Sequence, residues 1–153
     1  METGFLHLHN LVRWVILLLA LAVLLRALSA MNSKRPFHGA DRRLALFLLI
    51  FVDIQLLLGL ALYFMKDWVG VLSRGGFMSN SYLRFFAVEH TIGMLLGLIF
   101  IHIGYSATKS KKLSDHGKFK KWFWMTLIGL ICILITIPWP FRGEIGRALF
   151  PGA

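Results

Sequence analysis

The sequence predicts an all-helical integral membrane protein, built as an up-down bundle of four transmembrane helices. Hydrophobic residues make up 58% of its 153 residues and charged residues only 16%. Ordinary globular domains have about 45–50% apolar and about 25% charged residues. The apolar residues gather in four runs, about 6–28, 44–65, 85–105 and 122–139. Each run is long enough to cross a bilayer, since one crossing takes about 20 residues, the last being at the lower limit.

Each run is predicted to be a helix, because a lone strand in lipid would leave its backbone N–H and C=O groups without hydrogen-bond partners. The connections between the runs are short or moderate, and such connections join neighbouring helices in antiparallel order. The chain 1–153 is therefore predicted to form one membrane domain. Too few residues lie outside the runs for a large extramembrane catalytic domain.

The net charge of +10 (17 basic against 7 acidic residues) is expected to encode orientation. Ten of the 17 basic residues lie in or beside the first and third connections: Lys34, Arg35, Arg42, Arg43, Lys109, Lys111, Lys112, Lys118, Lys120 and Lys121. By the positive-inside rule this side of the membrane is cytoplasmic, so both termini are outside. We expect these basic residues to interact with the lipid bilayer and not with a nucleic acid.

Polar side chains within the apolar runs are the candidate functional residues, because they are costly in lipid and tend to face the bundle interior. They are His7, His9, Asn10 and Arg13 in the first helix, Asp53 and Gln55 in the second, and Glu89, His90 and His102 in the third. The single cysteine, Cys132, excludes a disulfide framework and a cysteine metal cluster.

Depth in the membrane selects one group of these residues. His9 and His90 each lie a few residues inside the outer end of their helix, at a similar level. Arg13 is four residues after His9 and shares its face. We expect Arg13 to pair with Asp53, Glu89 or both, and we interpret the two polar residues of the second helix as a structural polar network.

Two further features of the third helix have more than one interpretation. His102 follows His90 by twelve residues, about 18 Å along the helix, so one compact site cannot use both. We expect His102 to bond to a neighbouring helix; a second haem and a quinone headgroup are the alternatives. Gly93 and Gly97 favour close packing of another helix, and the alternative is a flat macrocycle held close to the backbone by His90.

Three hypotheses account for the outer histidines. In the first, His90 and either His9 or His7 ligate the iron of a b-type haem, because four-helix bundles offer interior sites between facing helices. In the second, the histidines join a structural network with Asp53 and Glu89. In the third, His7, His9, Glu89 and His90 form a histidine–carboxylate metal site, since imidazole and carboxylate both suit iron or zinc.

Four segments carry a resemblance to a family: L-H-L-H-N-L-V-R-W in the first helix, D-I-Q-L-L-L-G-L in the second, R-F-F-A-V-E-H in the third, and I-P-W-P after the fourth. Over nearly the whole chain they resemble short bacterial four-helix membrane proteins labelled cytochrome B. More distantly, the layout is similar to four-helix b-type cytochromes that pass electrons between quinol and a partner. The resemblance implies that His9 and His90 ligate haem and that Arg13 and Glu89 line the site. The second and fourth helices contain no histidine, so ligation from those helices is not available.

We therefore expect a single-haem b-type cytochrome, or a haem-bearing subunit, in the bacterial cytoplasmic membrane, exchanging electrons near the outer face. Quinol or another membrane redox subunit is the expected partner. An electron-transfer protein or an oxidoreductase subunit is favoured over a stand-alone enzyme. The alternative is a cofactor-free accessory subunit that packs against and stabilises a larger membrane complex.

Overall fold

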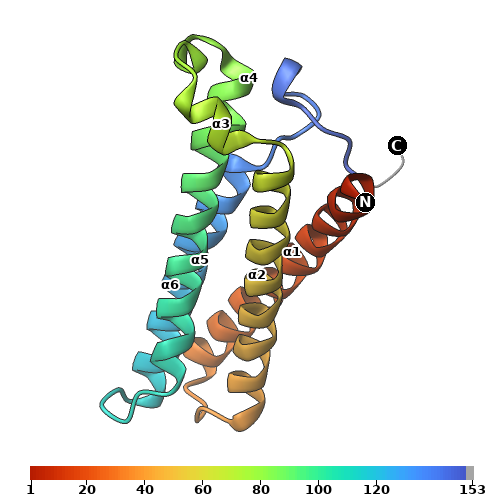
Figure 1. The fold of residues 1–153 in the computed structure, drawn as a ribbon. Coiled ribbons are helices and arrows are strands. Elements are labelled where there is room, and N and C mark those ends of the chain that lie inside the picture. The colour runs from red at the N-terminus through yellow and green to blue at the C-terminus, as the bar shows by residue number, and fades with distance from the viewer. Residues whose placement is uncertain (151–153) are drawn as a thin grey trace.

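Four long helices run the length of the molecule in the computed structural model, which describes residues 1–150 (Figure 1). They are α1 (Glu2–Ser33), α2 (Gly39–Met65), a third helix continuous over Ser81–Thr108, and α6 (Asp115–Thr136). Each is long enough and apolar enough to cross a membrane, and the described residues contain no strand. The predictions of an all-helical chain and of four membrane-length helices are confirmed.

The fourth helix ends before its apolar run does. The run continues to residue 139, whereas α6 ends at Thr136. Ile137 has an extended backbone (φ −68°, ψ 132°), which is the conformation that a following proline, here Pro138, imposes on the residue before it. The predicted boundary at residue 139 is therefore wrong by about one helical turn, because Pro138 ends the helix at Thr136.

The third helix changes its winding near its outer end. It consists of α4 (Ser81–Arg84), a π-helical turn η2 (Phe85–Glu89) and α5 (His90–Thr108). In a π-turn the backbone N–H bonds to the carbonyl five residues earlier, so the side chains that follow are rotated from their α-helical positions. This turn immediately precedes His90.

Short elements occupy the connection between α2 and α4 and the segment after α6. They are α3 (Trp68–Ser73), the 3₁₀ turn η1 (Phe77–Ser79) and the 3₁₀ turn η3 (Gly143–Ile145). Gly76, before η1, has a φ of 87°, a left-handed conformation that glycine adopts without steric cost. The sequence predicts only a turn region over residues 73–81.

The long helices form a ring in the order α1, α2, α5, α6, because α1 and α5 each pack against α2 and α6. α1 and α5 are therefore diagonal to each other. The N-terminus, the described segment after α6 and the α2–α4 connection lie at one end of the bundle, here named the terminal end, and the other two connections lie at the loop end (Figure 1). In this view the first turns of α1 lie apart from α5 at the terminal end.

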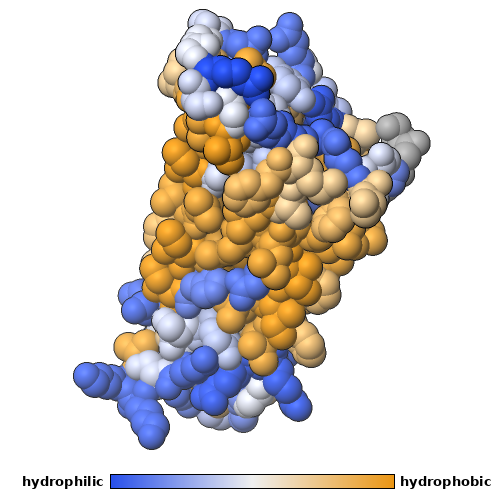
Figure 2. Space-filling view, in the orientation of Figure 1, coloured by the Kyte–Doolittle hydropathy of each residue, from blue (hydrophilic) through white to orange (hydrophobic). Residues whose placement is uncertain are grey.

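A hydrophobic band covers the middle of the visible surface, and hydrophilic residues cover both ends (Figure 2). Inside the bundle, Ala20, Val23 and Ala27 of α1 are fully buried. Their spacing of three and four residues places them on one helix face, and their small size lets α1 approach its neighbours closely. Larger side chains, Phe119 and Trp122, fill the core at the loop end.

Glycines bring α5 and α6 into direct backbone contact. A Cβ added to Gly97 would lie 2.7 Å from Ile133 Cγ1, and one added to Gly129 would lie 2.9 Å from the Gly97 carbonyl oxygen. A Cβ on Gly93 would collide with Thr136. The packing interpretation of this stripe therefore fits the structure, and the expectation that Gly93 and Gly97 contact a cofactor does not, since both face α6.

A buried carboxylate closes the turn between α1 and α2. Asp41 is fully buried and accepts hydrogen bonds from Arg26 at 2.5 Å, from Arg35 at 2.7 and 2.8 Å, and from the His38 backbone N–H at 2.8 Å. The two guanidinium groups neutralise a charge that would otherwise be costly to bury. This cluster ties the loop-end turn to the last third of α1.

Gly129→Val is expected to destabilise the fold by about 1–3 kcal/mol, because its side chain must push the α5 backbone away from α6. The measurement is the free energy of unfolding in detergent, from denaturant titration followed by circular dichroism. Gly4→Val is the matched control, since a Cβ at Gly4 has nothing within 4 Å. Equal stability of the two variants would contradict the close contact.

Asp41→Asn is expected to cost about 1.5–3 kcal/mol of unfolding free energy, because it leaves two arginines without their anion and weakens bonds to a charged acceptor. Glu2→Gln is the control: Glu2 pairs with Lys66 at 2.6 Å, but both side chains are partly exposed, and such pairs contribute little. Thermal unfolding of the two variants checks the ranking. A larger loss for Glu2→Gln would refute the proposed importance of Asp41.

Candidate functional site

A cavity of about 360 Å³ lies at the terminal end among α1, α2, α5 and the segment after α6. Its volume is within the range of about 300–1,000 Å³ found for ligand pockets. Most of its wall is apolar, including Ile16, Val52, Leu56, Met94, Leu98 and Ile133. The polar residues that line it include His9, Asn10, Arg13, Gln55, His90 and Arg147. An apolar cavity with a few convergent polar groups is the usual form of a binding site for a small molecule or cofactor.

His9 and His90 face each other across this cavity. Their ring centres are 6.4 Å apart and the ring planes meet at 60°. The two residues come from the diagonal helices α1 and α5 and lie at a similar level, as their predicted depth indicates. The structure thus brings together the two histidines that the sequence singles out. His7 also lines the cavity, but its side chain is exposed, so the geometry favours His9 as the partner of His90.

The ring of His90 is oriented by the end of α6. Its Nδ1 lies 2.8 Å from the carbonyl oxygen of Thr136. A carbonyl only accepts hydrogen bonds, so Nδ1 carries the proton and, in the neutral ring, Nε2 keeps its lone pair. Thr136 is the last residue of α6, and carbonyls of the last helical turn lack partners within their own helix. A histidine that donates its other ring N–H to a carbonyl is typical of metal ligation.

The π-turn before His90 separates two adjacent side chains with different environments. Glu89, the last residue of the turn, is exposed and pairs with Arg84 at 2.6 Å, whereas His90 faces the interior. Tyr63 of α2 donates a hydrogen bond of 2.9 Å to the Ala87 carbonyl within the turn. π-turns occur frequently at functional sites. Sequence reasoning missed this turn, because its residues are equally compatible with an α-helix.

The glycine at position 59 leaves room for the ring of His9. A Cβ added to Gly59 of α2 would lie 3.3 Å from His9 Cε1, so a larger residue there would press on the imidazole. Gln55, one turn before Gly59, donates a hydrogen bond of 3.0 Å to the His9 carbonyl. Gln55 thus acts on the backbone of α1 and not in a network with Asp53, which corrects that part of the sequence interpretation.

Four buried polar atoms around the cavity have no hydrogen-bond partner: His9 Nδ1, Asn10 Oδ1, Arg13 Nε and Gln55 Oε1. Only one other buried side-chain atom in the described residues, Thr126 Oγ1, shares this condition. An unsatisfied buried polar atom costs about 1–3 kcal/mol, and native proteins contain few of them. Their concentration in one cavity indicates a place where a ligand or water supplies the missing partners.

Arg13 does not pair with Asp53 or Glu89, contrary to expectation. Its Nη2 donates a hydrogen bond of 2.8 Å to the Leu149 carbonyl, which also accepts from Trp14 Nε1 at 2.8 Å. The segment after α6 therefore returns to the first helix and covers part of the cavity. Glu89 does not line the site, because it pairs with Arg84 on the surface.

Cationic groups dominate the charged lining of the cavity. Arg13, Lys66 and Arg147 line it, and no carboxylate does among residues 1–150. Lys66 is neutralised by Glu2. Arg147 bonds to the Tyr82 hydroxyl at 2.6 Å, a neutral partner. Sequence reasoning missed Arg147 and Tyr82, since both lie outside the apolar runs. This lining is therefore suited to an anionic group.

Asp53 lies away from this site. Its Oδ1 is 3.3 Å from His102 Nε2, on the face between α2 and α5. His102 therefore contacts a neighbouring helix, as expected, and the group that it approaches is the Asp53 carboxylate. The structural-network hypothesis joined the outer histidines to Asp53 and Glu89. It is wrong for both carboxylates, because Asp53 lies beside His102 and Glu89 pairs with Arg84.

The histidine–carboxylate metal site is also not supported. Nowhere in the described chain do three or more histidine, cysteine or acidic side chains gather as they must to hold a metal ion by themselves. Two facing imidazoles remain, so a metal bound between them would need its other ligands from water or from a cofactor.

No family model, curated protein or solved structure matches this chain.

Proposed function

We propose that the chain is a single-haem b-type cytochrome, or haem-bearing subunit, in which His9 and His90 are the axial ligands. The observation that carries the proposal is the separation of the two ring centres, 6.4 Å. A metal–imidazole bond is about 2.0–2.1 Å, and the ring centre lies about 1.1–1.2 Å behind the nitrogen, so two imidazoles that held one ion between them would have centres about 6.2–6.6 Å apart. The observed spacing lies within this range.

The remaining features of the cavity suit a porphyrin. Its apolar wall matches the macrocycle, and Arg13 and Arg147, whose partners in the described residues are neutral, match the two propionates. A porphyrin also supplies the four equatorial nitrogen ligands that this protein site lacks. The donor set of two imidazoles and no carboxylate is therefore more compatible with haem than with a free metal ion.

When bound, the haem supplies an iron that takes up and releases one electron. The chain contributes the environment that governs this exchange. The Thr136 carbonyl keeps His90 in the tautomer that can bind iron, and it increases the basicity of the ring. The apolar wall excludes water, and the arginines offset the charge of the propionates.

The surroundings of the site support a role in the membrane. The basic loop end is assigned to the cytoplasm by the positive-inside rule, which places the terminal end and the cavity near the outer face of a bacterial cytoplasmic membrane. The electron partner is then quinol or another redox subunit that reaches this face. The protein acts as an electron carrier or as part of an oxidoreductase complex.

Protein purified from a haem-replete host is expected to show a Soret band and a sharp α-band in the reduced-minus-oxidised spectrum. His9→Ala and His90→Ala are each expected to lower the haem content at least about tenfold, because each removes one iron ligand. The haem-to-protein ratio, from absorbance and total protein, is the measurement. His116→Ala, at an exposed histidine of the loop end, is the matched control and should keep the spectrum of the unaltered chain.

A colourless preparation with full helical circular dichroism would overturn the haem proposal. That result, together with copurification of larger membrane subunits at fixed stoichiometry, would favour the cofactor-free accessory subunit instead. Retention of the full haem content by both histidine variants would show that the ligands were misassigned.

A further inference from the structure

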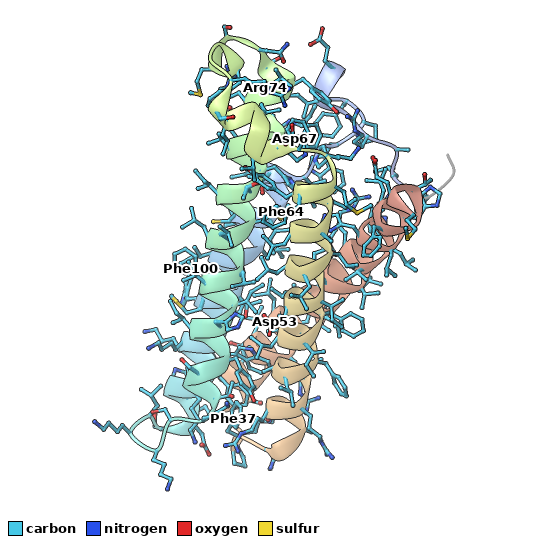
Figure 3. All side chains as sticks on the ribbon, in the orientation of Figure 1. Phe37, Asp53, Phe64, Asp67, Arg74 and Phe100 are labelled. Carbon is cyan, nitrogen blue, oxygen red and sulfur yellow. The ribbon has the colours of Figure 1, made fainter. Side chains whose placement is uncertain are left out.

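An open groove of about 510 Å³ lies between α1 and α2 near the loop end. Its lining consists of Ala22, Leu25, Arg26, Ser29, Arg35 and Leu44. Arg35 belongs to the connection between the two helices. Phe37, labelled at this end in Figure 3, anchors that connection to the core, with its ring centre 4.9 Å from that of Phe119. No described residue lines both this groove and the cavity of His9 and His90, so the groove is a separate feature of the bundle.

The groove carries more positive than negative charge. Arg26 and Arg35 share a single carboxylate, that of the fully buried Asp41. Asp115, the other carboxylate that the described residues place at the loop end, already pairs with Lys118 at 3.2 Å. One positive charge of the two arginines is therefore left without an anion, and an anionic group in the groove would balance it.

The two arginines differ in how many of their N–H groups are used. Arg35 directs both of its Nη atoms at Asp41, and its guanidinium lies 4.8 Å from the centre of the Phe119 ring. Arg26 bonds to Asp41 through Nε alone, its side chain is 41% exposed, and neither of its Nη atoms bonds to another described residue. Ser29 follows three residues later on the same helix face, and its hydroxyl also has no partner in the described chain. The groove thus offers several donors to one anion.

The level of Arg26 on α1 matches the surface of a bilayer. A helix of 32 residues is about 48 Å long, about 18 Å longer than the hydrocarbon core, so a centred helix extends about 9 Å beyond the core at each end. Arg26 lies about 10 Å before the end of α1 at Ser33. This is the boundary at which lipid phosphates lie. Towards the middle of α1, the exposed side chains of Leu18, Leu21 and Leu25 form one apolar stripe that runs into the groove.

We propose that Arg26 and Ser29 bind the phosphate of an anionic phospholipid, and that one acyl chain lies along Leu18, Leu21 and Leu25. The groove is at the end that the positive-inside rule assigns to the cytoplasm, and basic pockets between membrane helices on that side suit anionic headgroups. A zwitterionic lipid matches the groove less well, because its own cationic headgroup competes for the phosphate. This inference does not depend on the binding of haem.

Native mass spectrometry of the full chain in detergent, titrated with phosphatidylglycerol or with phosphatidylcholine of the same acyl chains, tests the site. Phosphatidylglycerol should bind more tightly. Arg26→Gln should weaken its binding about tenfold, the effect of losing one hydrogen bond between charged groups. Ser29→Ala should weaken it several-fold. Arg43→Gln is the matched control: it removes the same charge from the same end of the bundle, at an exposed residue outside the groove, and should leave the affinity unchanged.

Asp41→Asn separates a binding role of Arg26 from a purely structural one. It removes the anion that competes for both guanidinium groups, so we expect tighter binding of phosphatidylglycerol even though the fold is less stable. If Arg26 only supported the fold through Asp41, both variants would lose the lipid. Circular dichroism of each sample reports folding, and the exposed Ser29→Ala decides the question if Arg26→Gln does not fold.

Four results would overturn the inference. They are equal affinity for the two lipids, unchanged binding by both groove variants, an equal loss in Arg43→Gln, which would indicate diffuse attraction to the basic end, and binding of inorganic phosphate as tight as that of the lipid. The haem-to-protein ratio of the same samples tests the proposed function independently, so either proposal can fail while the other stands.

Discussion

The close approach of α5 to α6 is the packing constraint on which the candidate site depends. Gly97 and Gly129 allow the two backbones to touch, and Gly93 leaves space for the side chain of Thr136. The last turn of α6 consequently lies within hydrogen-bonding distance of His90, whose Nδ1–H satisfies the free carbonyl of Thr136. The glycines thus set the position of the histidine without contacting the cavity. The same contact between α5 and α6 therefore packs the two helices and orients the ring of His90.

The two ends of the bundle show opposite kinds of packing. At the loop end the core is filled by Phe119 and Trp122. The buried carboxylate of Asp41 accepts hydrogen bonds from Arg26, Arg35 and the backbone N–H of His38. At the terminal end the diagonal helices enclose a cavity with several unpartnered polar atoms. The end at which the buried charge has hydrogen-bond donors can stabilise the bundle, while the other end remains open for a ligand. This division is what we expect of a scaffold that holds a cofactor on rigid helices.

The sequence predicted the features that follow from periodicity and depth, and it missed those that depend on local chain geometry. Four helices and the pairing of His9 with His90 could be predicted because apolar length and distance from a helix end are readable from residues alone. The partner of Arg13 could not be predicted, because the returning segment that supplies the Leu149 carbonyl has no periodic signal. The positions of Asp53 and Glu89 were misjudged, since depth does not reveal which face of a helix a residue occupies, and a π-turn alters that face at Glu89.

The central claim, that one iron joins α1 to α5 through His9 and His90, is tested most directly by electron–nuclear double resonance on oxidised protein carrying ¹⁵N-histidine. We expect coupling of a low-spin ferric iron to two histidine nitrogens, with one coupling lost in His9→Ala and one in His90→Ala, in the haem that remains. A protein with no ferric haem signal, or with an iron coupled to a histidine other than these two, would contradict it.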